Sequence, residues 1–490
     1  MSKHESPWSL REYLFETFMK YYDTAYSLRD QAVVQERRNL LKEKHSVVAE
    51  PYIELQTEYA NAEQTFLEIG NKYRMPEFAS FVNAGLFPKN VKSPYSHQLA
   101  ALEASLAKKN IVIATGTGSG KTESFLLPIL FRLVRESKSW QSSRVNKAKY
   151  WWKEVEPKYF SSRSSETRPS AVRALVIYPM NALVEDQMTR LRKALHSPEI
   201  QEWFNTNRPN QKFFFGRYTG RSRKSGRIED ASNNELRELA QFLKVQESAH
   251  NKLLSDAEEN SQEHSYFLSD PTGPEMTLRW DMQENPPDIF ITNYSMLSIS
   301  LMRNIESPIF TKTKEWLESD PSNVFTLVVD EQHMYRGTQG TEIAYLIRRL
   351  LERLGLDKRP DQLSIIATTA SLSETEANQV FLKQFFASEK DFEFIKSKIR
   401  QPENLNEIEL RLYSEYFKNQ TYSPKEFSKL AGYLWPKEID SGDKFEELLK
   451  NQASKGISER LRYRTHLFFR TIPGLWACIN SNCSEVDELY

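Results

Sequence analysis

The residues most able to do chemistry lie in a glycine-dense stretch, ATGTGSGKT, at residues 114–122. A short β-rich run precedes this stretch, and a helical pattern begins near Lys121. Glycines let backbone N–H groups crowd around an anion, and the N-terminus of a helix adds a partial positive charge. We therefore predict a strand, a phosphate-binding loop and a helix, with Lys121 reaching the terminal phosphates of a nucleotide.

The same loop offers a ligand for the metal ion that accompanies nucleotide phosphates. The hydroxyl group of Thr122 is expected to bind Mg²⁺. The loop departs by one position from the strict G-x-x-x-x-G-K-T spacing, because Thr115 stands where the first glycine should be. An ordinary Gly/Ser loop is the alternative interpretation. The other residues expected to surround the phosphates are Thr117, Gly118, Ser119 and Gly120.

Two adjacent carboxylates, Asp330 and Glu331, directly follow the apolar run FTLVV at residues 325–329. In a doubly wound parallel sheet, functional side chains lie at the carboxyl ends of strands, facing the ligand crevice. Asp330 is predicted to complete the Mg²⁺ site, and Glu331 to polarise the attacking water as a general base. Alone, the pattern would also suit a surface turn. Together with the phosphate loop, it indicates a catalytic pair.

A basic stretch, QKFFFGRYTGRSRKSGR at residues 211–227, contains six Lys or Arg residues and no acidic residue. Such a composition suits phosphate neutralisation beside aromatic rings. The three phenylalanines are expected to form a buried strand, and a solvated basic loop is the alternative to a nucleic-acid contact. The remaining candidate contacts are Arg217, Arg221, Arg223, Lys224 and Arg227.

Taken in order, these and further motifs resemble those of superfamily 2 helicases, the DEAD/DEAH-box group in the broad sense, over residues 93–372. ATGTGSGKT and DEQH resemble motifs I and II, and SPYSHQ resembles the Q motif, which implies that Gln98 reads adenine. VIYPMNALVEDQ resembles motif Ia. RYTGRS and ITNYSML resemble the two DNA-contact motifs that follow it, and ATTASL resembles motif III.

The resemblance implies ATP and Mg²⁺ as ligands, and it assigns two further sets of residues. His333, Thr369 and Ser371 would couple the nucleotide state to the grip on nucleic acid. Motif III is usually spelled S-A-T, but the exchange of Ser and Thr here keeps both hydroxyl groups. The residues that the resemblance places against nucleic acid are Pro179, Asn181, Thr219, Gly220, Thr292 and Asn293, and Arg217 and Arg221 of the basic stretch complete the expected set.

The implied fold is α/β, a RecA-like parallel sheet flanked by helices, as in P-loop NTPases. This lobe is expected at residues 76–375, with insertions at about 137–170 and 228–285. The first insertion is expected to pack onto the lobe rather than form a strand-separating wedge, and the second to be disordered or helical. The flanking regions would be a helical region at 1–75, a helical connector at 376–465 and the start of a cysteine cluster at 466–490.

A finer resemblance is to large bacterial helicases of DNA repair and of phage-defence systems of the Druantia and DISARM type. It is carried by RWDMQENPPDIFITNYSML, HMYRGTQGTEIAYLIRRLLERLG and HLFFRTIPGLWACINSNC. This resemblance favours single-stranded or duplex DNA over RNA as the polymer and implies a bacterial protein, and the low cysteine count suits a reducing cytoplasm.

The sequence lacks motifs IV to VI, which in this family carry arginines that face ATP across a cleft between two lobes. An arginine finger accelerates turnover by roughly 10³ to 10⁵ in related NTPases. We therefore expect this chain to bind ATP but to hydrolyse it weakly. A second RecA-like lobe is expected in a longer chain or in a partner polypeptide.

The two cysteines, Cys478 and Cys483, lie near the end of the sequence with four residues between them. A structural zinc site needs four ligands, so Zn²⁺ is expected only if further ligands follow Tyr490. Two free thiols are the alternative. So few cysteines exclude a disulfide framework.

Composition narrows the classes of function without selecting one. The formal net charge is zero, so any nucleic-acid contact must be local. No apolar run approaches the roughly 20 residues that a membrane span needs. The sequence thus predicts the first motor lobe of an ATP-dependent DNA helicase or translocase. The alternatives are an RNA helicase, or a nucleotide-gated nucleic-acid-binding module without turnover.

Overall fold

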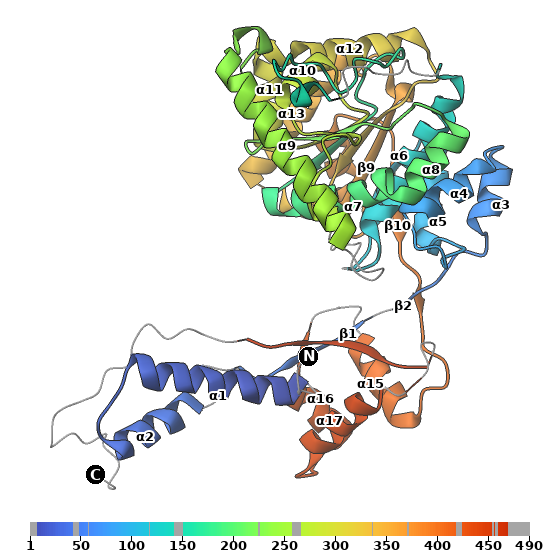
Figure 1. Cartoon of the computed structure of the whole chain (residues 1–490). Coiled ribbons are helices and arrows are strands. Elements are labelled where there is room, and N and C mark those ends of the chain that lie inside the picture. Colours follow the sequence, from blue (N-terminus) through green and yellow to red (C-terminus); the bar gives the residue numbers. More distant parts are fainter. Residues whose placement is uncertain are drawn as a thin grey trace. The chain divides into compact units, whose positions relative to one another are not determined.

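The computed structural model divides the chain into two compact units (Figure 1). The larger unit spans Tyr59–Lys398, and the smaller one combines Met1–Glu58 with Ile399–Tyr490. The residues that the structure describes are 7–42, 49–56, 58–116, 118–141, 150–223, 226–256, 266–335, 337–369, 372–417, 424–452, 455 and 459–468.

The larger unit is built on an eight-stranded sheet in the order β10-β3-β9-β8-β4-β7-β5-β6. Every neighbouring pair of strands in this sheet is parallel. The predicted α/β fold with a RecA-like parallel sheet is therefore confirmed. The strands are β3 (Asn110–Ala114), β4 (Ala174–Tyr178), β5 (Phe215–Tyr218), β6 (Glu275–Met276), β7 (Ile289–Asn293), β8 (Phe325–Val329), β9 (Leu363–Thr369) and β10 (Phe392–Lys396).

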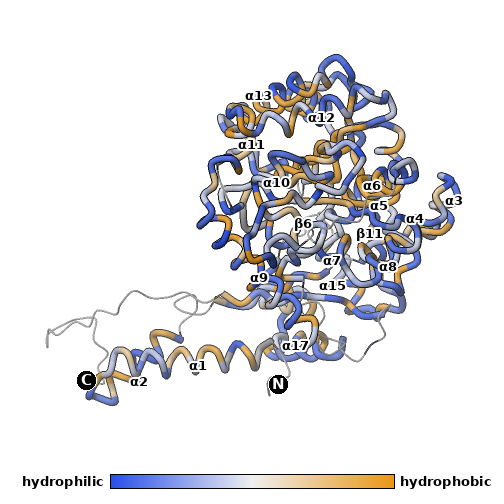
Figure 2. The backbone as a smooth tube through the Cα atoms, turned by 45° about the horizontal axis from the view of Figure 1, so that its top comes forward, coloured by the Kyte–Doolittle hydropathy of each residue, from blue (hydrophilic) through white to orange (hydrophobic). Residues whose placement is uncertain are grey.

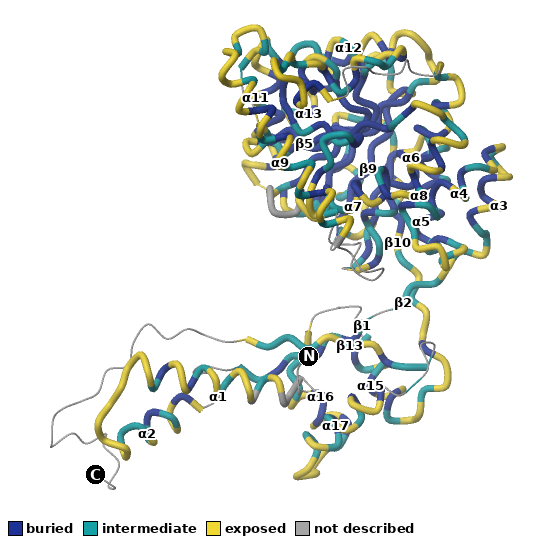
Figure 3. The backbone as a smooth tube through the Cα atoms, in the orientation of Figure 1, coloured by how far each residue is buried: buried dark blue, intermediate teal, exposed yellow. Residues whose placement is uncertain are grey.

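Helices cover both faces of this sheet, because successive side chains along each strand point to opposite faces. Ile111 and Ile113 of β3 pack into one hydrophobic cluster, whereas Val112 packs into the other. Figure 3 shows the buried strands between outer layers that are more exposed. The first cluster includes α3 (Phe66–Lys72), α4 (Glu77–Gly85), α5 (Ser96–Leu106), α6 (Lys121–Glu136), α7 (Asn181–His196) and α8 (Pro198–Asn207). The second includes α10 (Arg279–Glu284), α11 (Tyr294–Met302), α12 (Ser307–Ser319), α13 (Gly337–Leu354) and α14 (Glu376–Phe386).

The two insertions of the larger unit pack against one another. Trp151 and Trp152 of the first are buried against α9 (Asn233–Asp256), the long helix of the second. The indole Nε1 of Trp152 donates to a carboxylate oxygen of Glu247 at 3.1 Å. The described part of the first insertion is thus packed rather than presented as a wedge, and the described part of the second contains a long helix.

The smaller unit joins segments from both ends of the chain. Its central strand, β1, pairs antiparallel with β12 and β13, and Ile53 and Leu55 of β1 are buried against α15 to α17. Figure 2 shows that hydrophobic and hydrophilic residues alternate along α1. The elements are α1 (Pro7–Ala25), α2 (Gln31–Lys42), β1 (Tyr52–Gln56), α15 (Glu407–Phe417), β12 (Lys425–Glu426), α16 (Phe427–Leu434), α17 (Ser441–Asn451) and β13 (Arg462–His466). Two further strands, β2 (Glu58–Tyr59) and β11 (Ile399–Arg400), pair with each other.

These boundaries differ from the expected ones at 75, 375 and 465. The larger unit continues to Lys398 because α14 packs on the sheet and β10 pairs with β3. It begins at Tyr59 because α3 belongs to its core. The expectation of two separate helical flanks is corrected, since β1 and β13 place both ends of the chain in one sheet. Residues 469–490, which include Cys478 and Cys483, lie outside the described residues.

No helix in the described ranges is long and apolar enough to cross a membrane. Across the same residues, no group of three or more His, Cys, Asp or Glu side chains is arranged to hold a metal ion.

Candidate nucleotide and nucleic-acid site

The motifs singled out in the sequence gather at the carboxyl ends of neighbouring strands of the larger sheet. The phosphate loop follows β3, the Thr368–Thr369 pair ends β9, and Asp330 follows β8. Those three strands are adjacent, in the order β3-β9-β8. In the next strands of the sheet, Pro179 directly follows β4, Asn293 ends β7 and Thr219 directly follows β5. One edge of the sheet therefore carries the predicted nucleotide residues, followed by the predicted nucleic-acid residues.

The phosphate loop takes a conformation that needs its glycines. Gly118 and Gly120 have positive φ angles of 72° and 74°, a region that other residues rarely adopt. A Cβ atom on Gly120 would lie 2.5 Å from the side-chain nitrogen of Gln98. The hydroxyl groups of Thr115 and Ser119 lie 2.7 Å apart and link the two ends of the loop. Thr117 lies outside the described residues.

Lys121 and Thr122 open helix α6, and both make contacts across the sheet edge. The ammonium group of Lys121 lies 3.0 Å from a carboxylate oxygen of Glu331 and is 11% exposed. The hydroxyl oxygen of Thr122 accepts a hydrogen bond from the Gln187 side chain at 3.1 Å. The loop after β3 and the acids after β8 are thus brought together, although they are far apart in the sequence.

The two carboxylates occupy different environments. Burial raises the pKa of Asp330, and a hydrogen bond from the Thr368 hydroxyl group acts in the opposite direction. Glu331 has a left-handed backbone (φ +49°), and its amide donates to the Thr368 hydroxyl oxygen at 3.1 Å. The His333 ring nitrogen Nδ1 lies 3.2 Å from the Glu331 carboxylate. Thr368 therefore contacts both acidic residues.

The oxygen atoms at this edge suit a magnesium ion. Mg²⁺ prefers carboxylate and hydroxyl oxygens, usually with several waters retained. Asp330 supplies a carboxylate and Thr122 a hydroxyl group, on elements that the Lys121–Glu331 pair holds together. The donor set at this edge thus fits the ion expected from the sequence.

Gln98 lies behind the phosphate loop and is 1% exposed. Its side-chain oxygen accepts from the amide of Tyr95 at 2.8 Å, and its nitrogen donates to the carbonyl oxygen of Gly120 at 3.3 Å. In this state Gln98 braces the loop. A contact with adenine would require it to exchange one of these hydrogen bonds.

The predicted nucleic-acid residues divide into internal and surface groups. Thr292 donates to the carbonyl oxygen of Tyr218 at 2.7 Å, and Asn293 caps helix α11 by accepting from the amide of Met296 at 2.8 Å. Thr219 is buried. These three residues therefore make contacts inside the lobe at the carboxyl edge of the sheet.

At the surface of the same edge, Gly220 and Arg221 are exposed, and Arg217 forms an ion pair with Glu185. Pro179 is half-buried at the end of β4. The backbone of Asn181 begins α7, but its side chain is not described. Thr369 is buried at the end of β9, and Ser371 lies outside the described residues.

Sequence reasoning missed three residues of this site. Thr368 contacts both acids, Gln187 holds the Thr122 hydroxyl group, and the ring of His97 lies 2.8 Å from the carbonyl oxygen of Ser119. All three lie inside motifs that were recognised in the sequence, SPYSHQ, VIYPMNALVEDQ and ATTASL. Membership of a motif was the available signal, but the pairing of β8 with β9 was needed to select Thr368 over Thr369.

The comparisons with known proteins agree with the predicted resemblance. Residues 95–214 match the DEAD/DEAH box helicase family. The chain is similar to the Druantia protein DruE of Escherichia coli (strain UMEA 4076-1), with 31% identity over 96% of this chain and 30% of that protein. It is also similar to the uncharacterized ATP-dependent helicase MJ1574 of Methanocaldococcus jannaschii, with 23% identity over 77% of this chain and 35% of that protein. The chain thus spans about a third of the length of these relatives.

Solved structures with similarity to the chain include the DUF1998 helicase MrfA. Its complex with DNA and AMPPNP is 18% identical, covers 83% of this chain and 44% of its own, and has a TM-score of 0.38. Its complex with DNA is 19% identical, covers 74% of this chain and 32% of its own, and has a TM-score of 0.37. Through the family match and the DruE similarity, the predicted likeness to DEAD/DEAH-box helicases of the Druantia type is confirmed.

Proposed function

We propose that this chain is the first motor lobe of an ATP-dependent DNA helicase or translocase, and that it binds Mg²⁺-ATP at the carboxyl edge of the larger sheet. The observation that carries the proposal is the 3.0 Å contact between Lys121 and Glu331. This contact joins a glycine loop suited to phosphates with a carboxylate suited to activating water. The DEAD/DEAH box match over residues 95–214 supports the same assignment.

In this proposal, Lys121 exchanges its contact with Glu331 for the terminal phosphates of ATP. Glu331 is then free to accept a proton from water, with His333 beside it. Asp330 and Thr122 would hold Mg²⁺, which supplies charge neutralisation at the phosphates when bound. Thr368 positions both acidic residues through its hydroxyl group.

We propose DNA as the polymer and bacterial phage defence as the setting. The similarity to a Druantia protein supports the setting, and the name of the second relative supports ATP dependence. The nucleic acid would lie along the ends of β4, β7 and β5, next to the nucleotide. A second RecA-like lobe, in a longer chain or a partner polypeptide, would complete the motor.

Arg221 gives the nucleic-acid part of the proposal a direct test. Arg221 is exposed after β5, so Arg221→Gln is expected to weaken binding of single-stranded DNA without unfolding the chain. If Arg221 neutralises one phosphate, the slope of log affinity against log salt should become shallower by about 0.7. Fluorescence anisotropy of a labelled oligonucleotide at several salt concentrations measures both quantities.

Lys314→Gln provides the matched control, because Lys314 is an exposed cation on α12, outside the predicted nucleic-acid set. An unchanged slope in Arg221→Gln, or an equal change in Lys314→Gln, would contradict the proposed path. The same titration with RNA of identical sequence separates the two polymers. Tighter binding of RNA would favour the alternative, an RNA helicase.

A further inference from the structure

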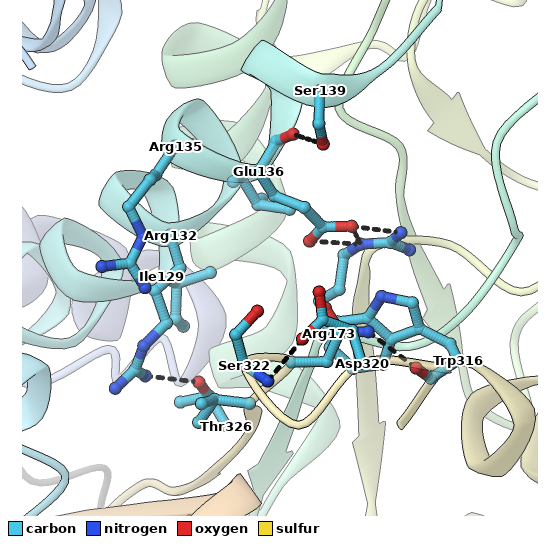
Figure 4. Close-up of a pocket in the computed structure, with 13 residues that line it drawn as sticks. Ile129, Arg132, Arg135, Glu136, Ser139, Arg173, Trp316, Asp320, Ser322 and Thr326 are labelled. Carbon is cyan, nitrogen blue, oxygen red and sulfur yellow. Dashed lines mark hydrogen bonds and ion pairs between the residues drawn. The ribbon is translucent and has the colours of Figure 1, made fainter. Parts of the chain in front are cut away.

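A polar pocket opens at the edge of the larger sheet opposite the nucleotide site, where the strands begin. It has a volume of about 250 Å³, several times the roughly 30 Å³ that a water molecule occupies in the liquid. The end of α6, the start of β8 and the segment that leads into β4 line it. Figure 4 shows Arg132 and Arg135 of α6 extending to the same side of this pocket.

Arg132 carries a charge that no acidic side chain of the described residues is seen to balance. Its guanidinium group donates to the hydroxyl oxygen of Thr326 at 2.9 Å and to the carbonyl oxygen of Ser105 at 2.5 Å. Both acceptors are neutral, and three of the five N–H groups of an arginine remain after these two bonds. Burial lowers the pKa of Arg132 to about 10, and the nearby charge of Arg135 acts in the same direction. Arg132 is therefore still charged at neutral pH.

The two carboxylates that line the pocket already have partners, and the partner of Glu136, Arg173, lines the pocket as well. Glu136 pairs with Arg173 through both of its oxygens, at distances from 2.7 to 3.1 Å. Asp320 is exposed and accepts from the backbone amide of Ser322 at 2.7 Å. Arg132 is half-buried, and removing a charge from water without giving it an ionic partner costs free energy. An anion that is not one of the described residues would therefore stabilise Arg132 and Arg135 in this arrangement.

We propose that this pocket binds a phosphate group, held between Arg132 and Arg135. Guanidinium groups match the paired oxygens of a phosphate and bind them with charge-assisted hydrogen bonds. The phosphate could be free or could belong to a nucleic acid, since both present the same oxygens. This site is distinct from the loop at Lys121.

The position of the pocket would link it to the nucleotide site. Arg132 lies eleven residues after Lys121 on α6, or roughly 16 Å along the helix axis. Thr326, on β8, lies four residues before Asp330, which directly follows that strand, or roughly 13 Å along the chain. A phosphate that strengthens the contact between Arg132 and Thr326 would therefore stabilise the packing of α6 against β8. These two elements adjoin the phosphate loop and the catalytic acids.

The test uses inorganic phosphate and the full chain with the Lys121→Ala substitution, which removes the phosphate loop as a competing site. Equilibrium dialysis of labelled phosphate at constant ionic strength is expected to show one bound phosphate per chain. Arg135→Gln, at an exposed position, should weaken this binding about fivefold, and Arg132→Met should abolish it. Asp320→Asn should tighten it, because a negative charge is removed from the pocket wall.

Arg349→Gln is the matched control, because Arg349 is an exposed arginine on α13, away from the pocket. Circular dichroism identifies a variant that fails to fold; if Arg132→Met does so, Arg135→Gln decides. If a short oligonucleotide displaces the labelled phosphate, the site binds the phosphates of a nucleic acid. If unlabelled inorganic phosphate displaces it and the oligonucleotide does not, the site binds a free anion. No bound phosphate, or the same affinity in Arg135→Gln and Arg349→Gln, would overturn the proposal.

Discussion

Replacing Lys121 by alanine is expected to weaken ATP binding by roughly 30-fold to several thousand-fold. This range corresponds to the roughly 2–5 kcal/mol that follows truncation of one partner in a buried, hydrogen-bonded charge pair. Lys121 is 11% exposed and stands at the start of the phosphate loop helix. Its removal would also leave the Glu331 carboxylate facing the phosphates without a compensating charge. Calorimetric titration with Mg²⁺-ATP measures the affinity.

Lys109→Ala is a suitable control for this experiment. Lys109 precedes the same strand, β3, but lies at its other end and pairs with Glu393 at the surface. We expect this variant to bind ATP like the unmodified chain. A free-energy change of 1.4 kcal/mol corresponds to a factor of ten in affinity. If Lys121→Ala changed the ATP affinity by less than about threefold, the loop around Lys121 would not be the phosphate-binding site.

Asp288→Asn is expected to cause the largest loss of stability, because Asp288 is the common partner of several buried arginines. Its carboxylate contacts Arg168 at 2.6 and 2.7 Å and Arg173 at 3.0 Å, with Arg163 at 3.7 Å. Asp288 is fully buried just before β7. Breaking a buried charge pair by removing one partner costs roughly 3–5 kcal/mol. Urea denaturation followed by tryptophan fluorescence measures this difference.

The loss of stability caused by Asp288→Asn should also depend on pH. Burial alone would raise the pKa of Asp288, but the charges of Arg168 and Arg163 hold it well below its usual range. An acid with a lowered pKa stabilises the folded state fully above its unfolded pKa, about 3.9, and loses this contribution as the pH falls below that value. The difference between Asp288→Asn and the unmodified chain should therefore be complete at neutral pH and narrow in acid.

Asp361→Asn is the matched control, since Asp361 makes a single ion pair with Lys390 at the surface. It should leave the urea midpoint almost unchanged, because exposed pairs contribute little. If Asp288→Asn shifted the midpoint no more than Asp361→Asn, the ion pairs of Asp288 with Arg163, Arg168 and Arg173 (the arginine cluster) would not contribute strongly to the stability of the fold.

The nucleotide site was predictable because its signals are local. The glycine loop before Lys121 and the apolar run before Asp330 can each be recognised from about ten residues of sequence. A parallel sheet then places the ends of their strands at one edge. The contacts that complete the site were not local. Thr368 reaches Asp330 only because β8 and β9 pair with Val329 opposite Ala367, and no residue type announces that register.

The smaller unit and the arginine cluster were missed for a related reason. β1 pairs with β13 through Tyr52 and His466, residues from opposite ends of the sequence. A five-residue strand with two buried positions is too short to stand out between helical stretches. Asp288 follows two prolines and suits an exposed turn by its sequence, whereas three distant arginines bury it.

The central claim is that Lys121, Asp330 and Glu331 form the ATP site of a nucleic-acid motor. Turnover of Mg²⁺-ATP by this chain, with and without single-stranded DNA, duplex DNA or RNA, tests it most directly, with Glu331→Gln as the blank. We predict slow turnover that falls to background in Glu331→Gln, while ATP binding is retained in that variant. Turnover at the same rate in Glu331→Gln, or no binding of ATP by the unmodified chain, would contradict the claim.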